Sequence, residues 1–304
     1  MTSPGGLRYP CPLLGALESS VNSTTSNPAK KIVPGLVLAA LAFGGAYYVT
    51  QGPAAPAGRK ALLELFPGDA TAAFLMPDVG GALVDVKALK DRFKVHVAAL
   101  APLLAEGSRL AGFNLEDPKT MKEIGLVPGG GFGAAAGPDW AALAFAVGDR
   151  SKFEAYVKAR FEGEVGSALV WDDAEREGLK VRLARSGDAD VFGLVYLRGH
   201  AVVAPTQDWE GRPVDPAKSL SKVAKTTRET SLASRADLAD PLGRIGEGAA
   251  AYLLTDLAAS AGLGADAAEA AKRPRDAEAL RKAAGQVRGF ALGVHIGADG
   301  LRMP

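Results

Sequence analysis

Residues 68–78 read GDATAAFLMPD, and residues 246–256 read GEGAAAYLLTD. Five of the eleven positions are identical, and three more pair Asp with Glu, Phe with Tyr and Met with Leu. Each stretch holds an apolar run that predicts a buried strand, at 71–76 and at 249–254. Each is followed by an alanine- and leucine-rich helical pattern and then by a Gly-Phe strand. This shared order indicates an internal duplication, with chance similarity in an alanine-rich chain as the alternative.

Periodicity and turn residues predict the elements around the two copies. Apolar residues at helical spacing predict a long helix at 79–110, with Pro102 as a potential break. Asp149 is a suitable N-cap for a helix over 150–161, and Arg198-Gly199 is suited to a tight turn between two strands. The other predicted helices are 118–124, 216–223, 236–245 and 265–287, the last interrupted near Pro274. The other predicted strands are 131–136, 141–147, 168–171, 179–184, 192–197, 201–204 and 290–296.

These elements predict an α+β fold, with an antiparallel sheet that carries long helices on one face and consists of two related halves. The first half covers 61–234 and includes a β-rich section, and the second covers 235–304. We expect the second half to be incomplete, because only a turn signal at 297–300 and four residues follow the strand at 290–296. That strand is then expected to leave an unpaired edge. Either the chain is part of a longer reading frame, or a partner completes the sheet.

One transmembrane helix is predicted before the folded part. Residues 32–49 read IVPGLVLAALAFGGAYYV, eighteen residues without a charge, and about twenty apolar residues span a bilayer core. Lys30 and Lys31 flank one end and Tyr47 and Tyr48 the other, as interfacial residues do. A buried core helix is the alternative, although a core helix rarely lacks every polar residue. The lipid bilayer is therefore the first expected partner, through residues 32–49.

The flanking charges predict a single-pass protein of the inner (cytoplasmic) membrane, with its C-terminal domain extracytoplasmic. Residues 1–31 are then a disordered cytoplasmic tail, and residues 50–60 a linker rich in Pro, Ala and Gly. A cleaved signal peptide is the main alternative, because small residues follow the apolar run at 52–58.

Composition narrows the function classes. The chain of 304 residues has 35 Lys and Arg against 34 Asp and Glu, so no global field attracts nucleic acid. The single cysteine, Cys11, precedes the apolar segment, which leaves the predicted domain without a disulfide or a cysteine zinc site. No nucleic-acid partner is expected.

Motifs that could carry chemistry do not fit their surroundings. Gly129–Ala134 satisfies GxGxxA, but a dinucleotide site needs a strand before it and a helix after it, whereas a strand is predicted to follow here. His96, His200 and His295 lie singly, without a carboxylate or second histidine at metal-ligand spacing. The tryptophans are too scattered for a carbohydrate platform. No catalytic, cofactor-binding or metal-binding residue is predicted.

Two groups of carboxylates have structural explanations. The acidic group at 172–177 lies between two predicted strands and lacks the ligand spacing of a calcium loop, which favours a solvated hairpin loop. Asp78 and Asp256 recur at the end of the repeated strand, where each is expected to cap the helix that follows.

Three stretches carry a resemblance to a known kind of protein: LFPGD at 65–69, GFNLEDP at 112–118, and FAVGD at 145–149 followed by Lys152-Phe153-Glu154. On these residues the chain resembles bacterial membrane-anchored envelope proteins with a repeated α+β domain of unknown function. The resemblance implies a location and a fold, and no activity.

The sequence therefore favours a membrane-tethered extracytoplasmic interaction or scaffolding domain. Its partners are envelope proteins or the chain itself. The alternative is a carrier that binds an apolar or lipid-like ligand between helices and sheet, and an enzyme is the least favoured class.

Overall fold

The computed structural model describes residues 58–82, 118–208, 211–256, 258, 259, 262, 265, 269, 272–284, 289–297 and 300–302. The described helices are α3 (Arg59–Leu65), α6 (Pro118–Glu123), α7 (Arg150–Val165), α8 (Pro216–Ala224), α9 (Ala236–Ile245) and α11 (Pro274–Ala284), with short 3-10 turns η2 (Arg228–Thr230) and η3 (Leu232–Ser234). The strands are β1 (Ala72–Met76), β2 (Phe132–Ala136), β3 (Ala141–Ala146), β4 (Val170–Arg176), β5 (Leu179–Ser186), β6 (Ala189–Leu197), β7 (His200–Pro205), β8 (Ala251–Asp256), β9 (Gly289–Gly297) and β10 (Gly300–Arg302).

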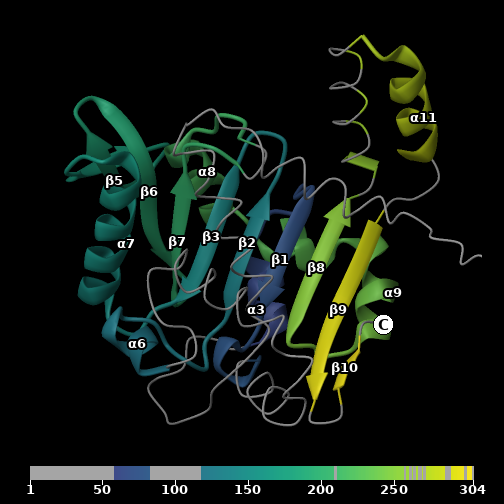
Figure 1. The fold of residues 1–304 in the computed structure, drawn as a ribbon, viewed down its shortest axis with the longest axis horizontal. Coiled ribbons are helices and arrows are strands. Elements are labelled where there is room, and N and C mark those ends of the chain that lie inside the picture. Colours follow the sequence, from purple (N-terminus) through teal and green to yellow (C-terminus); the bar gives the residue numbers. More distant parts are fainter. Residues whose placement is uncertain are drawn as a thin grey trace, which may run out of the picture.

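All ten strands form one open sheet in the order β10-β9-β8-β1-β2-β3-β7-β6-β5-β4 (Figure 1). Every neighbouring pair in this order is antiparallel. The β-rich section predicted within the first half continues the same sheet, because β3 pairs with β7 from Leu143↔Val203 to Ala146↔His200. An α+β fold with an antiparallel sheet is thus confirmed.

Local sequence signals account for several element ends. The Asp149 side chain accepts a hydrogen bond from the Lys152 N–H and caps α7, as predicted. Arg198 and Gly199 both have positive φ, at 49° and 80°, which fits the tight turn predicted between β6 and β7. Glu177 and Gly178 adopt the same combination, at 51° and 76°, and join β4 to β5.

Helices cover both faces of the sheet. The apolar residues of α3, α8 and α9 pack against one face, here called the α9 face. The longest described helix, α7, packs Phe153, Val157 and Phe161 against the other, here called the α7 face. Because side chains alternate along a strand, Val202 faces the first layer and Val203 the second. The prediction that long helices lie on one face is therefore wrong.

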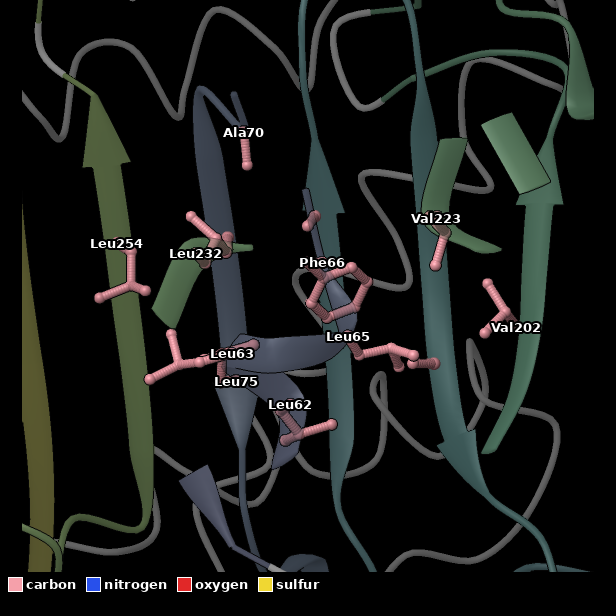
Figure 2. Close-up of a cluster of buried hydrophobic side chains, with 14 of the residues drawn as sticks. Leu62, Leu63, Leu65, Phe66, Ala70, Leu75, Val202, Val223, Leu232 and Leu254 are labelled. Carbon is pink, nitrogen blue, oxygen red and sulfur yellow. The ribbon is translucent and has the colours of Figure 1, made fainter. Parts of the chain in front are cut away.

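The main core lies on the α9 face. Figure 2 shows Leu62, Leu65 and Phe66, from α3 and its C-terminal cap, in one layer with Val202 of β7 and Val223 of α8. The side chains of Leu62 and Phe66 are completely buried. Gly133 of β2 makes room for this layer, since a Cβ there would lie 2.6 Å from the Phe66 ring. The glycine-rich stretch at 129–134 therefore leads into a tightly packed strand, as its context predicted.

The two matching stretches, at 68–78 and 246–256, lie side by side in the sheet, as its third and fourth strands from the β10 edge. A helix precedes each first strand, α3 before β1 and α9 before β8, and β1 pairs with β8. The predicted residue alignment, however, places Phe74 on Tyr252. Phe74 packs on the α7 face, whereas Tyr252 packs on the α9 face. The sequence alignment thus pairs residues whose side chains point to opposite faces of the sheet, so it is shifted by one residue relative to the strands.

Several predicted elements lie outside the described residues, among them the segment at 32–49 and most of the helix at 79–110. Within the described part of the chain, no helix has the length and apolarity needed to cross a membrane.

Candidate interaction surface

Small residues of β9 allow α9 to lie directly behind this strand. A Cβ at Gly289 would lie 2.5 Å from Asp237 Oδ2, near the start of α9. A Cβ at Gly293 would overlap Ile245 Cγ2 at the end of the same helix. The next residue on this face, His295, places its Nε2 3.0 Å from the Ile245 carbonyl oxygen. The helix therefore runs behind residues 289–295 of the strand, and Figure 1 shows α9 next to β9.

Large apolar residues occupy the opposite side of β9. Val294 packs on the α7 face with the cluster that contains Phe74 and Met76. Phe290 and Leu292 share this face, because residues two apart in a strand point the same way. Phe290 is 43% exposed, while Leu292 and its cross-strand partner Leu253 on β8 are half-buried. We call Phe290, Leu292 and Leu253 the Phe290 stripe.

Over much of its length, one side of the β9 backbone has no partner among the residues that the structure describes. The Val294 carbonyl accepts a hydrogen bond from the Ala250 N–H, so the polar groups of Val294 point toward β8. Gly289, Ala291 and Gly293 are an odd number of residues from Val294. Because the backbone groups of successive residues in a strand point to alternate sides, the N–H and C=O groups of these three residues point away from β8. On that side β10 pairs only with residues 295–297, and no other described strand pairs there. We call the backbone groups of Gly289, Ala291 and Gly293 the open edge.

The edge at the other end of the sheet is built differently. β4 reads VWDDAER, and the acidic group predicted to be a solvated hairpin loop lies largely in this strand. The loop prediction is therefore wrong: only Glu177 and Gly178 form the turn. Asp173 accepts a hydrogen bond of 2.7 Å from Arg182 of β5. Charged side chains on an edge strand disfavour pairing with another chain, so β4 is protected where β9 is not.

Ion pairs gather where β1 begins and β8 ends. Arg235 bonds to Asp237, Asp256 and the Ala70 carbonyl, and its hydrogen bond to Asp237 raises its pKa. This arginine thus joins α9, β8 and the segment before β1. Its partners are all protein groups, which favours a structural role.

A second group of ion pairs surrounds the buried Trp140 at the turn between β2 and β3. The Trp140 Nε1–H donates to Asp69 at 3.1 Å, and Lys222 bridges Asp69 and Asp139 at 2.7 and 3.0 Å. Hydrogen bonds from Lys218 and Lys222 lower the pKa of Asp139. Its carboxylate therefore stays ionised at neutral pH and is poorly suited to proton transfer.

The predicted lone histidines stay apart where they are described. His200 is buried in β7; burial lowers its pKa, and its Nε2 has no hydrogen-bond partner. His295 lies in β9 against the end of α9. His96 is outside the described residues. Among the residues that the structure describes, no group of three or more His, Cys, Asp or Glu side chains could hold a metal ion.

The repeated aspartates act as predicted. Asp78 Oδ1 accepts from the Gly81 N–H at 2.7 Å, and Asp256 Oδ1 accepts from the Ala259 N–H at 2.9 Å. Both carboxylates thus cap the start of the segment after their strand, as Asp residues commonly do.

Sequence reasoning missed the Phe290 stripe. Its signal is the alternation of small and large residues in Gly-Phe-Ala-Leu-Gly-Val at 289–294, which places one kind on each face. The open edge lies on β9, as do Phe290 and Leu292 of the stripe, and the open edge and the stripe together form the candidate surface.

Comparisons with protein-family models, with curated proteins and with solved structures find no match to this chain.

Proposed function

We propose that this chain is a membrane-tethered interaction or scaffolding module of the bacterial cell envelope. Its anchor is the apolar segment at 32–49, and its domain lies outside the cytoplasm. The observation that carries the proposal is that β9 combines the open edge with the Phe290 stripe. A strand that presents unpaired backbone groups and exposed apolar side chains together is a site for another protein.

The position of Arg59 supports a short tether. Arg59 donates hydrogen bonds of 2.9 and 2.8 Å to the Leu242 and Gly246 carbonyls, so the chain is fixed to the domain at this residue. Arg59 lies ten positions after Val49, the last residue of the anchor. An extended chain spans at most about 3.6 Å per residue, which keeps the domain within roughly 36 Å of the bilayer.

Dense packing favours this module over the alternative, a carrier of an apolar ligand. The space between the helices and the α9 face of the sheet is filled by completely buried side chains, including Leu62, Phe66, Leu220 and Tyr252. A carrier would need a cavity of several hundred Å³ there.

We also propose that two units, which meet at the β1–β8 pair, arose by duplication. Among the described elements, the order helix, strand, helix, strand, strand recurs as α3-β1-α6-β2-β3 and α9-β8-α11-β9-β10, and the copies extend in opposite directions from the β1–β8 pair. The aligned Gly68 lies four positions before the start of β1, but Gly246 lies five positions before the start of β8. This difference of one residue explains why the sequence match is out of phase with the sheet.

The proposal is tested on the full chain in bacterial cells. A reporter enzyme fused after residue 60 is expected to be active only outside the cytoplasm. The photo-crosslinker benzoylphenylalanine at Phe290 is expected to give a discrete protein adduct that disappears when Leu292→Asp charges the stripe. Val170 is the matched control position, because it is 69% exposed on the opposite edge strand and is expected to give none. Activity inside the cytoplasm, or equal adducts from both positions, would contradict the proposal.

A further inference from the structure

We propose that the partner is an extended protein segment that adds to the open edge of β9 as an antiparallel strand. This inference rests on the proposed function and specifies how the module binds. Gly289, Ala291 and Gly293 each direct an N–H and a C=O away from β8, and no described strand uses these groups. In antiparallel pairing, such alternate residues exchange both hydrogen bonds with the residue opposite. The open edge therefore matches the backbone of one more strand, about five residues long.

The position of α9 argues against a second copy as the occupant. Neighbouring strands lie about 4.8 Å apart, whereas packed helices need about 8–10 Å between their axes. Since α9 lies directly behind β9, at Gly289 and Gly293, two β9 strands paired edge to edge would bring two α9 helices too close together. A segment without a helix behind it avoids this conflict.

The two faces of β9 define the side chains of the segment. On the α7 face its residues would lie beside Phe290 and Leu292, where large apolar side chains bury exposed apolar surface. On the α9 face they would lie beside Gly289, Ala291 and Gly293, next to the helix, where small side chains fit. The segment thus alternates large apolar and small residues. β9 has this alternation itself, so a peptide copy of β9 is a suitable probe.

The probe is a fluorescein-labelled peptide with the sequence of residues 287–295, titrated into the full chain in lipid nanodiscs. Saturable binding is expected, together with slower hydrogen exchange of the β9 amides. N-methylation of the peptide residues that correspond to Gly289, Ala291 and Gly293 removes the donors that face β9 and is expected to weaken binding at least tenfold. The control peptide carries its three methyl groups on the residues that correspond to Phe290, Leu292 and Val294, whose N–H groups face away. It is expected to bind like the unmodified peptide.

A matching change in the protein is Ala291→Pro, which removes an outward N–H without touching the bonds to β8. It is also expected to weaken binding at least tenfold. Equal binding of the two methylated peptides, or no saturable binding at millimolar peptide, overturns strand addition. A crosslinked adduct at Phe290 that consists of two copies of this chain overturns the choice of partner. In either case the proposed function stands as long as Phe290 gives its discrete adduct in membranes.

Discussion

At the scale of single residues, contacts within a few positions could be predicted and distant ones could not. Asp149 caps a backbone N–H three residues away, so the pattern of the sequence alone identifies the interaction. Arg59 instead bonds to carbonyls 183 and 187 residues later in the chain. Its role depends on the folded arrangement of α3 and α9. No local sequence pattern links Arg59 to these two carbonyls.

Replacement of Arg59 tests whether this contact holds the tether end of the domain to α9. Its two bonds satisfy carbonyls at the C-terminus of the helix, where a cation is also favoured by the helix dipole. We expect Arg59→Ala to lower the free energy of unfolding by about 1.5–3 kcal/mol. The control is Arg244→Ala in the same helix, whose exposed pair with Asp240 is worth less than about 1 kcal/mol. Urea titration followed by tryptophan fluorescence measures both, and equal losses would contradict the assigned role.

At the scale of elements, strands with uniform burial were predicted well, whereas the charged edge strand β4 was predicted only at its start, by the strand at 168–171. β3 reads AALAFA and is buried on both sides, so its apolar run was sufficient. β4 carries Asp172, Asp173 and Glu175, which the sequence alone associates with a loop, although charges also protect sheet edges. The apolar runs of β3 and β7 indicate that both faces of the sheet are covered by other parts of the protein. The prediction of helices on one face did not take these runs into account.

Two glycine variants test the close packing of α9 on β9. Gly293→Ala places a methyl group against Ile245, and overpacking of this kind costs about 1–3 kcal/mol. Gly243→Ala lies within α9 and meets nothing within 4 Å, so the better helix propensity of alanine is expected to add about 0.5–1 kcal/mol. Denaturant midpoints of the two variants should therefore move in opposite directions. A neutral Gly293→Ala would mean that α9 does not closely approach β9.

At the scale of the whole molecule, the repeat indicated which strands lie together but not how many form one sheet. The matching stretches at 68–78 and 246–256 contain β1 and β8, which pair with each other within the sheet. The continuation of the sheet from β3 to β7 depends on a long-range pairing that no local pattern encodes. The expected division into halves at residue 234 thus crosses a sheet that is continuous from β10 to β4.

This continuity predicts that the two halves unfold together. β1 bonds to β2 on one side and to β8 on the other, so damage to β1 weakens both halves. Leu75→Ala in β1 removes a completely buried side chain and is expected to cost about 2–5 kcal/mol. We expect hydrogen-exchange protection of the most protected amides to fall equally in β2–β3 and in β8–β9, and urea unfolding to remain a single transition. Val170→Ala, at an exposed position on β4, should change neither measurement. Loss of protection confined to β2–β3, or a second unfolding transition, would show that the halves are independent units that share a strand pair.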